Sequence, residues 1–229
     1  MIKLVAFDWN GTILSDTNAV VKSESAVLVK YGLKPTDLKE FQNTYTTPFR
    51  NYWINMGIES KIFDQDALKI RKIFFKSYEP LEKFCRTRSG AREILKILKF
   101  KTIKSVIISN HPIGHIQAQL KRLKIQDLFK DVLGYTKVTD ISIMHKREKD
   151  EQLADYVRQN KYKPKEIIIV GDCDEEIEIG KEFGFFTVAL TGGYQSTKRL
   201  KAAKPDYLIH NLIDLKKIIQ KINKNNLSS

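Results

Sequence analysis

Residues 4–12 read Leu4-Val5-Ala6-Phe7-Asp8-Trp9-Asn10-Gly11-Thr12, and this stretch decides the fold. Four consecutive apolar residues are typical of a short strand that is buried on both faces of a sheet. The polar and turn-forming residues from Asp8 to Gly11 predict that the strand ends in a loop. The stretch therefore predicts a buried strand that carries a carboxylate to the edge of a sheet.

Four further apolar runs follow the first one. They are Ser105-Val106-Ile107-Ile108, Ile167-Ile168-Ile169-Val170, Thr187-Val188-Ala189-Leu190 and the weaker Tyr207-Leu208-Ile209. Helical periodicity appears between or beside these runs, in residues 91–98, 113–123, 151–159 and 212–222. Strands that alternate with helices predict a parallel sheet with helices on both faces, which is a three-layer, Rossmann-like α/β core.

Residues 17–86 interrupt this alternation. They contain helical periodicity, in residues 19–31 and 66–77, but no convincing buried strand. We therefore expect an α-helical cap domain formed by residues 17–86. The core would then consist of residues 1–16 and 87–229.

The composition indicates an ordinary globular protein. The chain has 229 residues, of which 42% are apolar, and no stretch approaches the roughly 18 apolar residues of a membrane span. The first residues lack the pattern of a signal peptide, so we expect a cytoplasmic protein with no membrane contact. Cys85 and Cys173 stand in unlike contexts and predict neither a disulfide nor a CxxC metal pair.

The net charge of +13 leaves two interpretations open, a nucleic-acid site or a solvated basic surface. Lysine is scattered along the chain and no aromatic-basic motif of the RNA-binding kind is present, so we favour the solvated surface. Nucleic acid is therefore not an expected partner. A small phosphorylated metabolite would still be attracted, and both a monomer and a homodimer remain open.

Three polar residues follow the apolar runs at the points where the strands are expected to end. They are Asp8, Ser109 and Asp172. Ligands of open parallel sheets bind beyond the carboxyl ends of the strands, so these side chains are expected to converge there. An aspartate at a strand end is often only a turn former, and each of them alone would favour that interpretation. Together, a hydroxyl and two carboxylates indicate a site for phosphate and a metal.

These residues resemble the motifs of the haloacid dehalogenase (HAD) superfamily, in particular its phosphoglycolate phosphatase and beta-phosphoglucomutase-like subgroup with a helical cap. The first motif resembles Phe7-Asp8-Trp9-Asn10-Gly11-Thr12, the second Ile107-Ile108-Ser109-Asn110, and the fourth Gly171-Asp172-Cys173-Asp174-Glu175-Glu176. Lys149, fifteen positions before Pro164, resembles the lysine of the third motif, and Lys146 is the alternative. Four motifs in order are far more specific than any one of them.

The resemblance implies a Mg²⁺-dependent phosphatase with Asp8 as the nucleophile. Mg²⁺ would be held by Asp8, the backbone carbonyl of Asn10, Asp172 and Glu176, because oxygen ligands select Mg²⁺ over softer metals. The resemblance also implies that Thr12, Ser109 and Lys149 bind the phosphoryl group, together with Asn110. A cation is needed at such a site because both the attacking carboxylate and the phosphoryl group are negative.

Asn10 departs from the family pattern. Phosphatases of the family usually carry a second aspartate at this position, which protonates the leaving group and then activates water. An amide cannot transfer protons in this way, although its backbone carbonyl can still bind Mg²⁺. Three alternatives follow: a phosphatase that uses another acid or substrates with good leaving groups, a phosphosugar mutase, and a phospholigand-binding relative with little activity. We favour the phosphatase because the remaining motif residues resemble a working site, with Glu176 in the place of the family's last aspartate, where it could bind the metal directly or orient a metal-bound water.

The cap is expected to select the substrate. Tyr45, Thr47 and Arg50 lie in a Pro-containing stretch between helices, and Arg50 could bind a carboxylate or a second phosphate. An ordinary exposed loop arginine is an equally good interpretation. The histidines at 111, 115 and 145 lack the usual ligand spacing, so no metal site is expected from them.

Overall fold

The computed structural model describes residues 1–136, 142–145 and 149–225. Its core is a six-stranded sheet in the order β5-β4-β1-β6-β7-β8, and all neighbouring pairs are parallel. The strands are β1 (Leu4–Phe7), β4 (Lys104–Pro112), β5 (Asp131–Tyr135), β6 (Ile167–Gly171), β7 (Phe186–Leu190) and β8 (Tyr207–Ile209). The predicted α/β fold with a parallel sheet is therefore confirmed.

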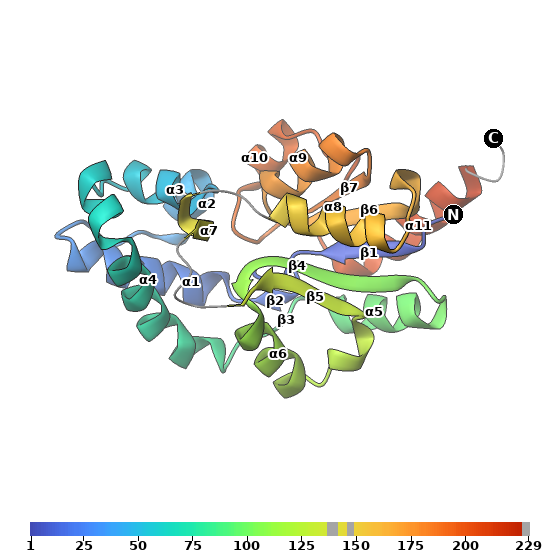
Figure 1. Ribbon diagram of the computed structural model, residues 1–229, viewed down its shortest axis with the longest axis horizontal. Helices are drawn as coiled ribbons and strands as arrows, with labels where there is room; N and C mark the ends of the chain where they lie inside the picture. Colours follow the sequence, from blue (N-terminus) through green and yellow to red (C-terminus); the bar gives the residue numbers. More distant parts are fainter. Residues whose placement is uncertain (137–141, 146–148, 226–229) are drawn as a thin grey trace.

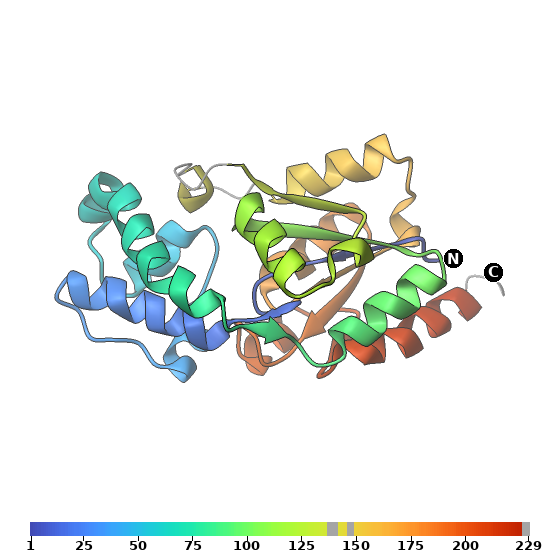
Figure 2. The same cartoon turned by 90° about the horizontal axis from the view of Figure 1, so that it is seen from below.

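Helices cover both faces of this sheet, as Figures 1 and 2 show. The side chains of Val5 and Phe7 pack with α5 (Ala91–Phe100), α6 (Ile113–Arg122) and α11 (Leu215–Asn225). Leu4 and Ala6 point the other way and share a core with α8 (Lys149–Gln159) and α9 (Asp174–Phe183). The continuous apolar run of β1 follows from this arrangement, because alternate side chains enter two different cores.

The remaining elements of the core are short. They are α10 (Thr197–Ala202) and three turns of 3₁₀-helix, η1 (Gln126–Leu128), η2 (Pro164–Glu166) and η3 (Leu212–Asp214). Gly184 ends α9 in a left-handed conformation with φ of 73°, which favours glycine. The two ends of the described chain meet on the core, where the backbone N–H of Ile2 donates to Asn223 Oδ1 at 2.7 Å.

Strand β5 was not among the predicted strands. It forms one edge of the sheet, contains Gly134 and is only partly buried, so it lacks the long apolar run that identified the others. The expected end of β4 at Ile108 was also wrong. This strand continues through Ser109 and His111 to Pro112, although its register with β5 shifts after Ile108.

The four helices α1 (Thr17–Lys30), α2 (Leu38–Thr44), α3 (Phe49–Asn55) and α4 (Ser60–Glu82) lie together beyond one end of the sheet (Figure 1). They share an aromatic core that includes Phe41, Tyr52 and Phe63. The short α7 (Ser142–His145) adds Met144 to this core. On the core side, the chain passes through an antiparallel pair, β2 (Leu14–Ser15) and β3 (Arg86–Thr87). This pair lies where the sequence predicted the cap to begin and end.

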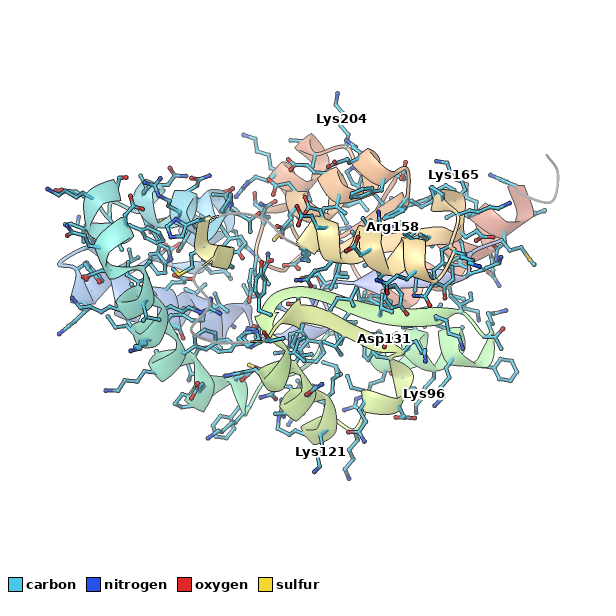
Figure 3. The ribbon with its side chains drawn as sticks, viewed as in Figure 1. Lys96, Lys121, Asp131, Arg158, Lys165 and Lys204 are labelled. Carbon is cyan, nitrogen blue, oxygen red and sulfur yellow. The ribbon has the colours of Figure 1, made fainter. Side chains whose placement is uncertain are left out.

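Basic side chains are spread over the surface of the core. Figure 3 shows Lys96, Lys121 and Lys204 extending outward from separate parts of the molecule. The choice between a solvated basic surface and a polyanion-binding face stays a prediction. Among the described residues, no helix combines the length and the apolar character that crossing a bilayer requires.

Candidate active site

The three central strands bring the predicted motif residues together. Strand β1 lies between β4 and β6, and Phe7 pairs with Ile107 on one side and Val170 on the other. Asp8 directly follows β1, Ser109 lies in β4, and Asp172 directly follows β6. Because the strands are parallel, these residues meet at the same edge of the sheet, on the side where the cap lies (Figure 1).

Lys149, the first residue of α8, contacts acidic residues that follow two of these strands. Its Nζ donates to Asp8 Oδ1 at 2.7 Å and to Glu176 Oε1, and lies 3.6 Å from Glu175 Oε2. The ammonium is buried. The structure thus places Lys149 where the third motif requires a cation, whereas the alternative, Lys146, lies outside the described residues.

The electrostatics of the site reflect burial of several carboxylates in one place. Burial raises the pKa of Asp172 to about 7, and the negative charge of Glu176 adds to this effect. Burial also raises the pKa of Asp8, although Lys149 opposes the shift. Burial would lower the pKa of Lys149, but Asp8 and Glu176 outweigh it and raise this pKa well above its ordinary value. The lysine therefore stays cationic.

These carboxylates fit a divalent cation. Asp8, Asp172, Glu175 and Glu176 are all buried, and in the described part of the chain Lys149 is the one cation in ion-pair contact with any of them. Four acids against one lysine leave excess negative charge in a buried place, which a bound cation would offset. Oxygen donors in such a set suit Mg²⁺.

Thr12 is not placed as predicted. Its hydroxyl is fully buried and donates to Asp172 Oδ1 at 2.5 Å, and it does not line the pocket described below. The backbone N–H of Tyr194 donates to the other oxygen of the same carboxylate at 2.6 Å. Thr12 therefore orients a predicted metal ligand instead of contacting phosphate directly.

Ser109 and Asn110 do lie in the pocket. Ser109 Oγ accepts the backbone N–H of His111 at 3.1 Å, which fixes the hydroxyl at the end of the strand. Asn110 Nδ2 donates to Glu175 Oε2 at 3.0 Å. Their predicted contact with the phosphoryl group is compatible with these positions and remains a prediction.

Asn10 is hydrogen-bonded to Asp16, an acidic residue that the sequence did not indicate as part of the site. Its Nδ2 donates to Asp16 Oδ2 at 2.7 Å and to the Tyr78 hydroxyl at 3.1 Å. Asp16 is buried, and it also accepts hydrogen bonds from Gly11 N, Tyr78 Oη and Tyr194 Oη. Asp16 directly precedes α1 and so reads as an N-cap in the sequence, yet its side chain makes no capping bond.

One pocket extends from these residues into the cap. Its volume is about 810 Å³, including the space that opens to solvent. Asp8, Asn10, Ser109, Lys149 and Glu176 line it on the core side. On the cap side the lining is largely aromatic and consists of Tyr45, Phe49, Trp53, Phe74, Phe75 and Tyr78.

Glu24 and Arg71 are the charged cap residues of this pocket, and neither was predicted. Glu24 is only 4% exposed, and its Oε2 has no hydrogen-bond partner among the residues that the structure describes. Burial raises the pKa of Glu24 well above its ordinary value. Its spacing offered a signal, because Glu24 lies at helical intervals between the buried Val20 and Leu28, where an apolar residue is expected.

Arg50 is placed away from the pocket. Its guanidinium is bonded to Asp64 at 2.8 and 2.9 Å and also to Ser60, all within the cap, and Arg50 is not among the lining residues. The geometry supports the alternative interpretation of an ordinary surface arginine. Of the other proposed cap contacts, Tyr45 lines the pocket and Thr47 does not.

Comparison with known proteins decides the family. Residues 5–190 match the haloacid dehalogenase-like hydrolases. The chain belongs to this family. Curated relatives of this hydrolase include the phosphoglycolate phosphatases of Synechococcus elongatus and Mannheimia succiniciproducens, which are 24% and 25% identical to it. The alignments cover 93% and 95% of this chain, and 95% and 98% of those relatives.

Solved structures show the same fold. A predicted phosphatase from Clostridium acetobutylicum superposes with a TM-score of 0.81 at 17% identity, over 96% of this hydrolase and 99% of that chain. A haloacid dehalogenase-like hydrolase from Streptococcus pneumoniae gives 0.78 at 16% identity, over 95% and 98% of the two chains. The similarity thus extends over the cap as well as the core.

Proposed function

We propose that this hydrolase is a Mg²⁺-dependent phosphatase that removes phosphate from a small phosphorylated metabolite through an aspartyl-phosphate at Asp8. The observation that carries the proposal is the contact of Lys149 with Asp8 at 2.7 Å, at the edge of the sheet and inside a pocket. A nucleophile, a cation for the phosphoryl oxygens and a group of metal-binding carboxylates are thereby brought within one site.

The chemistry follows in two transfers. An Asp8 oxygen attacks phosphorus while the bond from phosphorus to the leaving oxygen breaks, and water then attacks the acyl phosphate to release inorganic phosphate and restore Asp8. Lys149 and Ser109 would bind the phosphoryl oxygens. Mg²⁺, held by Asp8, the carbonyl of Asn10, Asp172 and Glu176, would neutralise charge as it builds up. Thr12 and the Tyr194 amide keep Asp172 oriented for that role.

The residues that line the cap side of the pocket limit the range of substrates that we expect. The curated relatives are named phosphoglycolate phosphatases, and glycolate is a small anionic leaving group. Here the lining is mostly aromatic, and burial disfavours a negative charge on Glu24, so this side chain offers a substrate a neutral hydrogen-bonding group. Arg71 is the residue of this lining that would attract a carboxylate. This lining favours a leaving alcohol that has apolar or aromatic surface and a hydrogen-bond donor for Glu24.

A substrate panel tests the proposal. The purified protein should release phosphate from p-nitrophenyl phosphate and other monoesters with apolar alcohols, with a higher kcat/KM than for 2-phosphoglycolate. Chelation with EDTA should abolish turnover and Mg²⁺ should restore it. Asp8→Asn should lose activity by at least about 10³-fold, whereas Asp155→Asn, an exposed change on α8, should not. Full activity of the Asp8→Asn protein would refute the mechanism.

The alternative of a phospholigand-binding relative keeps one observation in its favour, which is the amide of Asn10. It predicts tight binding of a phosphorylated compound with no turnover across the panel. The phosphosugar mutase alternative predicts transfer of phosphate between sugar hydroxyls with little free phosphate released. Assaying both inorganic phosphate and isomerised product on the same panel separates all three.

A further inference from the structure

A second group of metal-ligating side chains lies where the cap meets the core. Glu82 is the last residue of cap helix α4, His111 follows Ser109 by two residues in β4, and His115 lies in the first turn of α6. Their three ligand atoms all lie within 4.8 Å of one another. Glu82 and His111 are buried, and His115 is partly buried. The group therefore joins an element of the cap to two elements of the core.

The spacing of these atoms would admit a shared ion, with each histidine facing a different oxygen of the Glu82 carboxylate. His111 Nε2 lies 3.4 Å from Glu82 Oε1, and His115 Nδ1 lies 3.5 Å from Glu82 Oε2. Ligands about 2.0–2.2 Å from a tetrahedral zinc lie about 3.4 Å from one another. Both distances are long for a hydrogen bond, and within the described part of the chain neither Glu82 Oε1 nor His111 Nε2 has a hydrogen-bond partner. Two buried polar atoms thus face each other in an ion pair that lacks a good hydrogen bond, and a shared metal ion would satisfy both of them.

The surroundings of His115 add a second indication. Its other ring nitrogen, Nε2, faces Glu79 Oε1 at 3.8 Å. Metal-bound histidines commonly direct their free N–H toward a carboxylate, which fixes the ring and strengthens it as a ligand. Two imidazoles and one carboxylate are also the donor set that favours zinc and similar transition metals over Mg²⁺. The sequence led us to expect no metal site from these histidines, and Glu82 lies 29 positions before His111.

We propose that Glu82, His111 and His115 form a binding site for a zinc-type divalent metal that fastens the cap to the core. This site is separate from the phosphotransfer residues and does not depend on the proposed phosphatase activity. An ion there would hold the end of α4 against the segment of β4 that carries Ser109 and His111. His111 also lines the substrate pocket, so metal binding would stiffen one wall of it.

Zn²⁺ binding to the whole protein tests the proposal. Chelator-treated protein is titrated with Zn²⁺ in a large excess of Mg²⁺, and the melting temperature and bound zinc are measured. We expect one equivalent to bind and to raise the melting temperature. His115→Gln should weaken binding at least about 100-fold, since loss of outer contacts alone costs about 10–100-fold. His145→Gln, which replaces an exposed histidine outside the group, should leave the affinity unchanged.

Two further measurements distinguish this site from the predicted Mg²⁺ site and test it without relying on the folding of a variant. Asp172→Asn removes a ligand of the predicted Mg²⁺ site and should retain the zinc equivalent. Cobalt(II) should give the visible spectrum of a tetrahedral ion in wild-type protein, which needs no variant to fold. The proposal is overturned if wild-type protein takes up no equivalent under excess Mg²⁺, if Asp172→Asn abolishes it, or if His115→Gln binds as well as His145→Gln does.

Discussion

At the scale of single residues, the hydrogen bonds of Asn10 explain why the site tolerates an amide at this position. The amide donates to Asp16, whose carboxylate is buried and already accepts three other hydrogen bonds. Burial raises the pKa of Asp16, although these donors oppose the shift. An aspartate at position 10 would place a second carboxylate against this one, so the amide avoids a repulsive pair.

Asn10→Asp should restore proton transfer at a cost in stability. We expect kcat for an alkyl phosphate to rise about 10²-fold, the lower end of what a general acid contributes. The gain with p-nitrophenyl phosphate should be smaller, because that leaving group needs little protonation. The free energy of unfolding should fall, and Asp16→Asn in the same protein should recover part of it. Equal changes in kcat for both substrates would count against the role given to position 10.

Glu24 should make stability depend on pH. Its pKa is raised in the folded protein, so above the ordinary value near 4.5 the unfolded chain releases a proton that the folded protein retains. The wild-type protein should therefore lose stability relative to Glu24→Gln as pH rises from about 4.5 toward neutrality. Urea unfolding of both proteins at a series of pH values measures this difference. A constant difference would mean that Glu24 is not held protonated in its buried position.

Site residues could be predicted from the sequence only where a neighbouring apolar run or a short motif marked them. Asp8, Ser109 and Asp172 each follow or end an apolar run, and Lys149 was found through its motif spacing. Asp16, Tyr78 and Tyr194 were missed because their contact joins positions 62 and 178 apart in the chain. Thr12 was assigned to phosphate because nothing in the sequence shows which way a hydroxyl points.

At the scale of elements, helix α9 is positioned by its close approach to the sheet. A Cβ at Gly180 would lie 2.3 Å from Thr187 Cγ2 and 2.7 Å from Ile169 Cγ2, so the helix can pack this close only with glycine there. The same helix carries Glu175 and Glu176 in its first turn. Its distance from β6 and β7 therefore helps to place two acids of the site.

Gly180→Ala should destabilise the protein by about 1–3 kcal/mol, the usual cost of overpacking a core. Gly114→Ala is the matched control, because it also replaces a helical glycine but a Cβ there meets nothing within 4 Å. This control should be neutral or stabilising by up to about 1 kcal/mol, since alanine favours helix. Urea denaturation measures both. Equal stabilities of the two variants would show that α9 can shift away from the sheet at little cost.

The elements that the sequence predicted are those with a strong local pattern. The central strands are continuous apolar runs because both faces of the sheet are covered, and α5, α6, α8 and α11 show clear helical periodicity. The edge strand β5 and the acidic start of α9 lack such patterns. Their positions depend on neighbours that are distant in sequence, so local patterns could not reveal them.

At the scale of the whole molecule, the pocket depends on how the cap meets the core. Gln42 of α2 donates to the carbonyl of Gly193 at 2.8 Å and accepts the N–H of Ser196 at 3.0 Å, and Arg199 donates to the carbonyl of Tyr45. These contacts join the cap to residues 193–199, and the backbone N–H of Tyr194 in this segment donates to Asp172. The cap side of the pocket and the proposed Mg²⁺ ligand Asp172 are therefore mechanically linked. Glu82, His111 and His115 lie at the same junction of cap and core.

The central claim is that Asp8 carries the phosphoryl group. Its most direct test is mass spectrometry of protein quenched in acid during turnover of p-nitrophenyl phosphate with Mg²⁺, followed by peptide mapping. The account predicts one added phosphoryl group, about 80 Da, on the peptide that contains Asp8, and none in Asp8→Asn. Sustained phosphate release without any labelled Asp8 peptide, or a label on another residue, would contradict it.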